Sequence, residues 1–334
     1  MAEGVPIQSS QLVTVYGGSG FVGRHVVRAL AKHGYRIRVA VRRPDLAGHL
    51  QPLGRVGQIH SVQANLRYKD SVMAAARGAD VVINLVGVLK ESGRQTFSAV
   101  QAFGSRMVAE AAAAQGARLV HVSALGADPN SQSDYARTKA AGESAVLSAV
   151  PKATIFRPSV IFGPEDQLFN RFAALASRLP VLPLAGAATR FQPVYVGDVA
   201  EAIAMAADGR VPGGHVYELG GPEVKTLREI VDYTMQVTGR RRPVIALPPA
   251  LAGAMAGIVQ LTDKLSFGLM PDYMVLTRDQ VTLLGTDNVV SQTAIDSGRT
   301  LKDLGIAPTA YEAIVPGYLW RFRRSGQFSD IRTI

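Results

Sequence analysis

Residues 13–23 read Val13-Thr-Val-Tyr-Gly-Gly-Ser-Gly-Phe-Val-Gly23, an apolar strand pattern that passes through glycines into the start of a helix. Gly17 permits a sharp turn, Gly20 lets main chain approach a pyrophosphate without an intervening Cβ, and Gly23 allows the helix to pack closely on its strand. The N-terminus of that helix offers unpaired N–H groups and the positive end of its dipole to phosphates. The pattern therefore predicts a dinucleotide-binding loop; a purely structural tight turn is the alternative.

Strand and helix patterns alternate after this loop, and continuous apolar runs such as Asp80–Val86 are typical of buried parallel strands. We therefore predict an α/β fold, a Rossmann doubly wound parallel sheet with a smaller, mainly helical C-terminal lobe. The expected division is an N-terminal tail at 1–10, a Rossmann domain at 11–165 and 190–220, and a substrate-lobe or docking region at 166–189 and 221–334.

Three local patterns in the second half of the chain give more detailed expectations. Thr154–Phe162 is predicted as one strand. Leu179–Ala188, which is rich in proline and glycine, is predicted as a loop. Thr226, followed three residues later by Glu229, is predicted to open a helix with a capping box.

Basic residues follow the second predicted strand, Tyr35–Val41, at the point where a Rossmann fold meets the adenine ribose. An NAD-specific loop places a carboxylate there, whereas this chain has Arg42-Arg43-Pro44. A guanidinium suits a 2′-phosphate, so NADP is favoured over NAD. A solvated basic turn is the alternative. Asn65, in the loop after the third predicted strand, is a candidate contact to the adenine ring, or simply a turn residue.

A serine, a tyrosine and a lysine form a candidate proton-transfer site. Ser123 ends the strand pattern at 118–123, on the sheet edge where doubly wound folds bind ligands. Tyr135 and Lys139 are four residues apart in a predicted helix and so share one face. An ammonium beside a phenol lowers the pKa of the phenol and can also hold a ribose, while a serine hydroxyl can polarise a carbonyl. From the residues alone, Tyr135 and Lys139 could equally be ordinary residues on a helix surface.

These motifs, together with Arg157-Pro-Ser-Val-Ile-Phe-Gly-Pro164, resemble the short-chain dehydrogenase/reductase superfamily in its extended or atypical branch. The resemblance implies that Tyr135 is the general acid/base, that Lys139 assists it and holds the nicotinamide ribose, and that Ser123 orients substrate. The residues expected to contact the cofactor are Gly17, Gly18, Ser19, Gly20, Phe21, Gly23, Arg42, Arg43, Asn65, Leu85, Val86, Gly87, Ser123, Tyr135, Lys139, Arg157 and Pro158.

Longer motifs are similar to the nucleotide-binding accessory subunits of respiratory complex I, NADH:ubiquinone oxidoreductase. The resemblance covers nearly the whole chain and is carried by Asn84–Gly87, His121–Ser123, Phe162–Asp166, Gln192–Asp198 and Lys302–Ile306. It implies tightly held NADPH in a structural role, docking among other complex I subunits on the peripheral arm near the membrane and the quinone site, and no known turnover. Because Ser123, Tyr135 and Lys139 are all retained, missing residues give no argument for catalytic silence.

Composition narrows the chemistry further. The chain of 334 residues has no cysteine, which excludes disulfides, thiolate nucleophiles and cysteine-ligated metal centres. Its six histidines are scattered singly, so we expect no metal. The net charge of +10 favours an anionic partner such as a nucleotide or an acidic surface. Residues 1–10 lack the pattern of a signal peptide, which predicts a place in the cytoplasm or on the cytoplasmic face of an energy-transducing membrane.

The C-terminal third has a docking character. Arg240-Arg-Arg-Pro243 leads into the uncharged segment Val244–Thr262, which is interrupted by Pro248-Pro249, and then into Phe267, Leu269, Met270, Tyr273 and Met274. A proline-broken apolar segment is not expected to span a membrane, and lying on a lipid surface or on a partner protein is favoured. A buried helix of the substrate lobe is the alternative. Tyr318–Arg324 mixes aromatics with arginines, a composition that could anchor the segment at an interface. Because no nucleic-acid motif accompanies it, we expect no binding of nucleic acid.

Three functions remain open from the sequence. The first is the accessory subunit of complex I. The second is a free-standing NADP-dependent reductase or epimerase acting on a small carbonyl substrate, and the third is a nucleotide-sensing regulatory protein.

Overall fold

The computed structural model describes residues 11–265, 271 and 274–323, which form two compact units. The sheet unit contains residues 11–158, 196–219 and 291–307, and the second unit contains 159–195, 220–290 and 308–323. Several predictions fall outside the described residues, namely those for the tail at 1–10 and for Phe267, Leu269, Met270, Tyr273 and Arg324.

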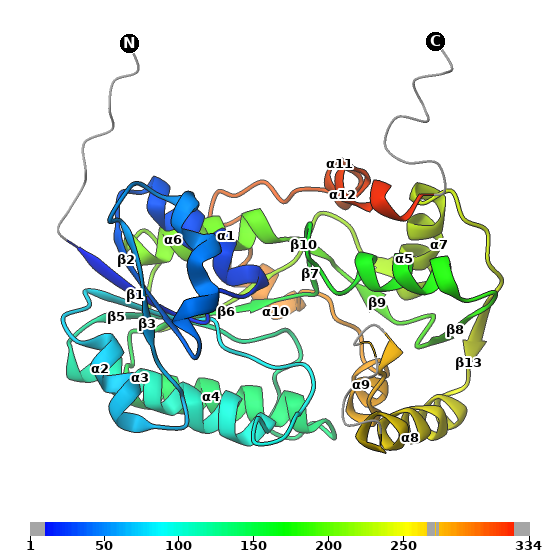
Figure 1. The fold of residues 1–334 in the computed structure, drawn as a ribbon, viewed down its shortest axis with the longest axis horizontal. Helices are drawn as coiled ribbons and strands as arrows, with labels where there is room; N and C mark the ends of the chain where they lie inside the picture. Colours follow the sequence, from blue (N-terminus) through cyan, green and yellow to red (C-terminus); the bar gives the residue numbers. More distant parts are fainter. Residues whose placement is uncertain (1–10, 266–270, 272–273, 324–334) are drawn as a thin grey trace, which may run out of the picture. The chain divides into compact units, whose positions relative to one another are not determined.

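A seven-stranded, fully parallel sheet forms the centre of the sheet unit (Figure 1). Its strand order is β11-β6-β5-β4-β1-β2-β3, so the order reverses between β1 and β4. That switch point is where open α/β sheets bind ligands, at the carboxyl ends of the strands. The strands are β1 (Leu12–Tyr16), β2 (Arg36–Val41), β3 (Ile59–Gln63), β4 (Val81–Asn84), β5 (Arg118–Val122), β6 (Thr154–Pro158) and β11 (Val216–Leu219).

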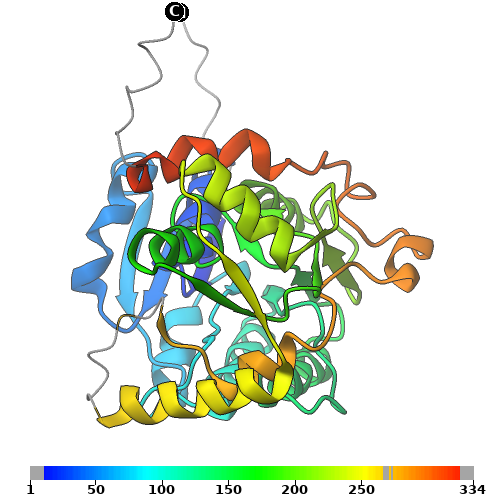
Figure 2. The same cartoon turned by 90° about the vertical axis from the view of Figure 1, so that its right-hand side faces the viewer.

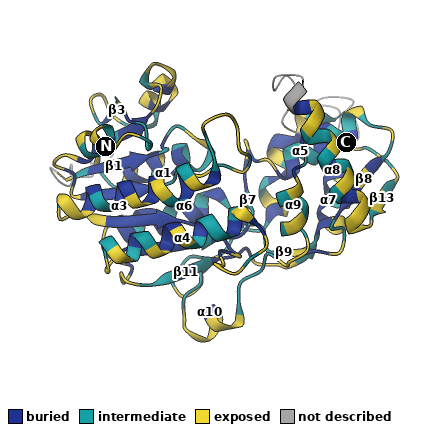
Figure 3. Ribbon diagram, turned by 90° about the horizontal axis from the view of Figure 1, so that it is seen from below, coloured by how far each residue is buried: buried dark blue, intermediate teal, exposed yellow. Residues whose placement is uncertain are grey.

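Helices cover both faces of this sheet, which confirms the predicted Rossmann architecture (Figure 1). On one side α1 (Phe21–Lys32) packs against α6 (Val196–Ala207); on the other, α3 (Gly104–Ala114) packs between α2 (Lys69–Ala76) and α4 (Asp134–Ala149). The strands of the sheet are largely buried, as Figure 3 shows by colour, and most of their buried residues are apolar. The sheet unit also contains the 3-10 helix η1 (Pro44–Leu53), the π-helical turn η2 (Ser98–Phe103) and α10 (Gln292–Asp296).

The second unit combines two-stranded sheets with helices (Figure 2). The pairs are β7 with β10, β9 with β12, and β8 with β13. Helix α5 packs on α7, and α8 packs on α9. The elements are β7 (Ile161–Phe162), α5 (Phe169–Arg178), β8 (Leu182–Ala185), β9 (Arg190–Phe191), β10 (Val194–Tyr195), β12 (Lys225–Thr226), α7 (Leu227–Val237), β13 (Val244–Leu247), α8 (Pro249–Leu265), α9 (Arg278–Leu283), α11 (Tyr311–Ile314), α12 (Pro316–Leu319) and η4 (Trp320–Phe322).

Two secondary-structure predictions were wrong, both because pairing between distant segments decides them. The single strand expected at Thr154–Phe162 is two strands, β6 and β7, which belong to different sheets and different units. The loop expected at Leu179–Ala188 contains β8, which pairs in parallel with β13 about sixty residues later. Thr226 and Glu229, by contrast, form the predicted capping box at the start of α7.

The chain returns to the sheet unit late, at Ser291–Ala307. The backbone N–H of Ser291 donates to the Glu218 carboxylate (2.7 Å), and Glu218 on β11 forms a bridge with Thr300. The sequence-based division had placed these residues in the C-terminal region, because nothing local marks the return.

The uncharged segment Val244–Thr262 consists of β13 followed by α8. Among the described residues, no helix combines the length and the apolar character needed to cross a bilayer.

Candidate functional site

The glycine loop after β1 has the geometry that a nucleotide loop needs. Gly17 adopts a positive φ of 81°, which side chains rarely tolerate, and its N–H donates to Ala40 O (3.2 Å). A Cβ at Gly23 would overlap the Gly17 carbonyl oxygen and the Gly18 backbone, so only glycine fits where α1 crosses the loop. A Cβ at Gly20 would make only ordinary contact, 3.4 Å from Gly17 O. Packing within the loop therefore does not require a glycine at position 20.

The backbone N–H groups at the N-terminus of α1 lie at the end of this loop. Gly20 is the N-cap, no side chain caps the helix, and no acidic residue lies in its first turn. The free N–H groups and the helix dipole are therefore available to a pyrophosphate. Of the other predicted contacts, Ser19 and Phe21 are partly exposed and Gly18 is buried, a Cβ there falling 2.8 Å from Val39.

The two arginines after β2 differ in their interactions. Arg43 donates through Nη2 to Asp45 Oδ2 (2.7 Å) and through Nε to both Asp45 carboxylate oxygens, which raises the pKa of Arg43 and lowers that of Asp45. Arg42 is exposed, and within the described part of the chain it forms no side-chain hydrogen bond or ion pair. Arg42 is thus the arginine available to a phosphate.

Asn65 lies after β3 in a self-contained turn. Its Oδ1 accepts from the Arg67 N–H (3.2 Å), while Ser71 Oγ bonds both its backbone N–H and its carbonyl. The side-chain oxygen is therefore committed to the turn, and the NH₂ group is what Asn65 can offer to a base edge.

The loop after β4 lies against the glycine loop. Leu85 N–H donates to Tyr16 O (3.0 Å), and a Cβ at Gly17 would fall 3.1 Å from Val86 Cγ2. A Cβ at Gly87 would fall 3.2 Å from Lys139 Nζ. The loop thus connects the predicted pyrophosphate site with the predicted catalytic lysine, across the switch point of the sheet.

Lys139 is a buried cation on the inner face of α4. Its Nζ donates to Val122 O (3.3 Å) and lies 5.9 Å from the centre of the Tyr135 ring. Burial lowers the pKa of Lys139 to about 8, and the charge of Glu143 acts in the opposite direction. The structure therefore brings Lys139, Tyr135 and the end of β5 together, as the helical spacing predicted.

Ser123 and Tyr135 complete this group. Ser123 follows Val122 directly, and its Oγ is buried with no hydrogen-bond partner among the described residues. A buried hydroxyl without a partner is costly in a folded protein unless a ligand satisfies it. Tyr135 is half-buried and packs edge-to-face on Phe97, with ring centres 5.8 Å apart. Together these groups can hold a ribose and move a proton at the Tyr135 oxygen.

Arg157 has a structural commitment that the sequence did not reveal. Its Nε donates to Glu143 Oε1 (2.8 Å) and its Nη2 to Glu143 Oε2 (2.6 Å), and Glu218 lies 3.9 Å away. The hydrogen bonds that Arg157 donates to the Glu143 carboxylate are the main cause of a raised pKa for Arg157. Pro158 is buried, and its carbonyl accepts from Leu125 N–H (3.0 Å). Cofactor contacts from these two residues remain a prediction.

Sequence reasoning missed a buried polar residue, Gln101 on the π-helical turn η2. Its Nε2 donates to Val88 O (2.7 Å), and its Oε1 accepts from Thr138 Oγ1 (2.9 Å) on α4. Gln101 therefore ties the loop after β4 to the helix of Tyr135 and Lys139. A polar side chain on the buried face of a helix was the available signal, and π-helical turns occur often at functional sites.

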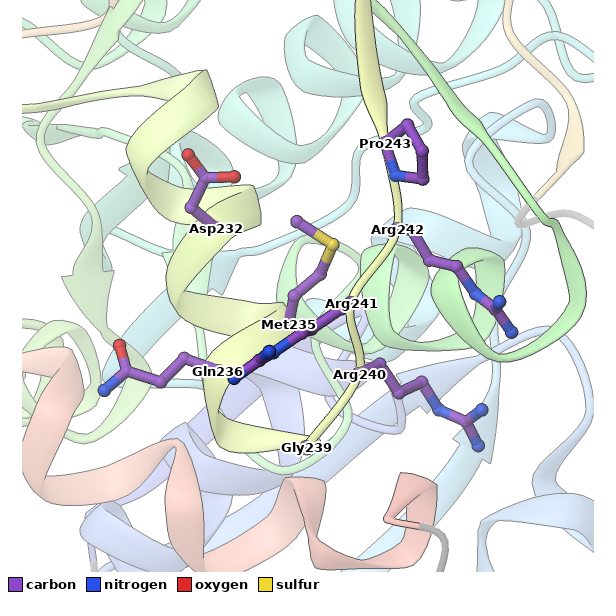
Figure 4. A pocket seen from close by; sticks show the side chains of 8 residues that line it. All are labelled: Asp232, Met235, Gln236, Gly239, Arg240, Arg241, Arg242 and Pro243. Atoms are coloured by element: carbon purple, nitrogen blue, oxygen red, sulfur yellow. The ribbon is translucent and has the colours of Figure 1, made fainter.

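A surface hollow in the second unit lies among the arginines that precede β13 (Figure 4). Arg240 donates to Phe322 O (3.0 Å) and Arg242 to Ala176 O (3.1 Å), so these two side chains serve backbone carbonyls, whereas Arg241 is exposed. The hollow contains none of the predicted cofactor residues; it is lined by Asp232, Met235, Gln236, Gly239, Arg240, Arg241, Arg242 and Pro243.

Comparison with known proteins agrees with this geometry. The profile of the NAD dependent epimerase/dehydratase family matches residues 13–220. Subunit 9 of the NADH dehydrogenase [ubiquinone] 1 alpha subcomplex from Arabidopsis thaliana is 36% identical over 324 residues, covering 95% of this chain and 79% of that protein. A ceramide reductase from Caulobacter vibrioides is 38% identical over 239 residues, 71% of this chain and 74% of that protein.

A solved structure of an NADPH-dependent quinone oxidoreductase from Escherichia coli, in complex with NADPH, shares the fold. Its TM-score is 0.70 with 22% identity, over 92% of this chain and 99% of that chain. The family and the fold together support a nicotinamide nucleotide as the cofactor. The chain belongs to the NAD dependent epimerase/dehydratase family, within the group that contains subunit 9 of the NADH dehydrogenase alpha subcomplex.

Proposed function

We propose that this protein is an accessory subunit of respiratory complex I that holds NADPH as a tightly bound, mainly structural cofactor. The observation that carries the proposal is the similarity to subunit 9, which extends over 95% of the chain and so includes the second unit as well as the nucleotide-binding sheet. The expected place is the peripheral arm, near the quinone site, on the cytoplasmic face of the energy-transducing membrane.

NADPH is proposed over NADH because of Arg42. An exposed guanidinium at the carboxyl end of β2, without an acidic partner among the residues that the structure describes, suits a 2′-phosphate. Gly17, Gly20 and Gly23 would then surround the pyrophosphate. Lys139 and Tyr135 would hold the nicotinamide ribose. Bound NADPH supplies a hydride donor, whether or not the protein uses it.

Helix α8 offers the second unit a surface for docking. Leu251, Ile258 and Leu261 are 60%, 65% and 58% exposed and lie on one face, opposite the buried Ala252 and Ala256. No charged residue occurs between 249 and 262. An apolar partner, protein or lipid, would bury this face at a gain of about 25 cal/mol per Å².

Purification from the protein's own membranes in mild detergent tests the proposal. We expect the protein to migrate with a large respiratory assembly, to be identified by mass spectrometry beside other complex I subunits, and to release NADPH on denaturation. A soluble monomer or dimer without such subunits would contradict the assignment.

A free-standing reductase is the second candidate. It is favoured by the buried Ser123 hydroxyl, which has no partner among the described residues and follows Val122, the residue whose carbonyl accepts from Lys139. The ceramide reductase similarity suggests a long-chain carbonyl substrate. If this candidate holds, the purified protein should oxidise NADPH with a long-chain ketone, and Tyr135→Phe should abolish the reaction. Equal rates in both proteins would assign any turnover to another site.

A further inference from the structure

A buried polar pair joins two neighbouring strands of the central sheet, at the start of the loop after β4. Asn84 ends β4, His121 lies on β5, and the two are direct partners in the strand register. Each side chain is only 1% exposed. Neither residue takes part in the proton transfer or phosphate binding discussed above, and an apolar residue at either position would avoid the cost of burying polar groups.

The hydrogen bonds of Asn84 are fully committed. Its side-chain nitrogen lies 3.2 Å from His121 Nδ1 and 3.3 Å from Ser105 Oγ, and its Oδ1 accepts from the Val86 N–H (3.1 Å). Because an amide NH₂ group can only donate, His121 Nδ1 must accept, which places the imidazole proton on Nε2. The pair therefore has a single consistent arrangement of donors and acceptors.

This arrangement bears on the loop that faces the cofactor. Asn84 fixes the backbone of Val86, and Val86 Cγ2 contacts the position where Gly17 would carry a Cβ. Gly87, one residue on, lies under Lys139 Nζ. Adenosine lies on the β2 side of the switch point, where Arg42 is, so the β4 side receives the nicotinamide half.

We propose that Asn84 and His121 form a charge-neutral positioning pair that sets the loop Leu85–Gly87 for the nicotinamide half of the dinucleotide. The inference rests on the proposed cofactor binding and names residues that act on the cofactor through the loop rather than by contact. Burial lowers the pKa of His121 to about 3, with the charge of Lys139 acting in the same direction. The imidazole thus stays neutral, and Lys139 is the cation beside this loop.

The test separates the two halves of the cofactor. Dissociation constants of the full-length protein are measured by calorimetry for NADPH and for adenosine 2′,5′-bisphosphate, which contains only the adenine half. We expect Asn84→Leu and His121→Leu each to raise the dissociation constant of NADPH by about tenfold, which corresponds to the loss of one buried hydrogen bond. The dissociation constant of the bisphosphate should change by less than about twofold. The double variant should bind NADPH no more weakly than the single variant with the larger loss of affinity, because both changes break the same pair.

A matched control removes another buried hydrogen bond in the same sheet. Thr14 Oγ1 donates to Ala75 O (3.1 Å) on α2, away from the loop after β4. Thr14→Val should lower the melting temperature and leave the ratio of the two dissociation constants unchanged. If the Asn84 and His121 variants weaken the binding of both ligands equally, as a general loss of structure would, the positioning role is wrong. It is also wrong if they weaken the binding of neither ligand.

A measurement on the unmodified protein covers the case in which the variants do not fold. The ¹⁵N chemical shifts of His121 should show an unprotonated Nδ1 and a protonated Nε2, unchanged from pH 5 to 8. A proton on Nδ1, or a titration in that range, would overturn the pair as described. If the unmodified protein binds the bisphosphate but not NADPH, the inference fails while the adenine site stands, and if it binds neither, the proposed cofactor function fails as well.

Discussion

At the scale of single residues, the structure separates neighbours that look equivalent in the sequence. Arg42 and Arg43 are adjacent, exposed and identical in chemistry, yet Asp45 engages only Arg43. The same holds for the arginines at 240–242, where alternation along an extended segment directs Arg240 and Arg242 to backbone carbonyls and leaves Arg241 exposed.

Arg42→Ala should weaken NADPH binding by about ten- to a hundredfold, because a charge-assisted hydrogen bond to a phosphate contributes about 1.5–3 kcal/mol. NADH binding should change little, since NADH has no 2′-phosphate. Arg43→Ala is the matched control and should leave both affinities nearly unchanged. Titration calorimetry with each nucleotide decides the question; equal losses for NADH and NADPH in Arg42→Ala would refute the 2′-phosphate assignment.

Lys139 gives a prediction about pH and stability in the protein without cofactor. Its folded-state pKa of about 8 lies below the ordinary 10.5, so between these values the unfolded chain binds more protons and stability rises with pH. Below about pH 8 the buried charge costs roughly 3 kcal/mol. Lys139→Met should therefore raise the free energy of unfolding at pH 7 and flatten its rise between pH 8 and 10.5.

Urea denaturation across that pH range checks the Lys139 prediction, with the exposed Lys152→Met as control. The Lys139 variant should also bind NADPH more weakly, because it would lose the proposed contact to the nicotinamide ribose. A variant that is less stable at pH 7, with the same pH profile as the parent, would show that the ammonium is not strained by burial.

At the scale of elements, the glycine loop combines two requirements that substitutions can separate. Gly23 is needed for packing, because a Cβ there overlaps backbone of the loop, whereas Gly20 has room for one. The sequence motif predicts close packing at Gly23 and approach of the pyrophosphate at Gly20. The path of α1 across the loop accounts for the first role, and the second stays a prediction.

Gly23→Ala should destabilise the sheet unit by several kcal/mol, through a backbone shift that also removes nucleotide binding. Gly20→Ala should keep nearly full stability and lose nucleotide affinity, because its Cβ would occupy the space proposed for the pyrophosphate. Thermal unfolding combined with NADPH titration distinguishes the two. Normal affinity in Gly20→Ala would mean that the pyrophosphate does not approach the loop there.

Elements set by local signals were predicted well, and those set by distant partners were not. The capping box at α7 was found because Thr226 and Glu229 are three residues apart. Strand β8 was missed because the partner it pairs with, β13, lies about sixty residues later, and Pro183 within it argued for a loop.

At the scale of the whole molecule, the exposed face of α8 tests the docking function directly. Replacing Leu251, Ile258 and Leu261 with serine should release the protein from the proposed membrane assembly without lowering NADPH affinity, because these side chains face solvent in the second unit. Val56, which is fully exposed on the sheet unit, provides the control, and Val56→Ser should leave assembly intact. The fraction that co-sediments with membranes is the measurement; unchanged co-sedimentation of the triple variant would exclude α8 as the docking face.

The sequence by itself determined the parallel sheet, the glycine loop and the helix that carries Tyr135 and Lys139. These features depend on residues close together in the chain, whose spacing reports strand alternation, helical faces and tight turns. Only the tertiary structure decided that Arg157 is held by Glu143 and Glu218, that residues 291–307 return to the sheet unit, and that Asn84 meets His121 across the sheet. Each of these contacts joins segments 14 to more than 70 residues apart, and no local pattern records a partner that only folding brings within hydrogen-bond distance.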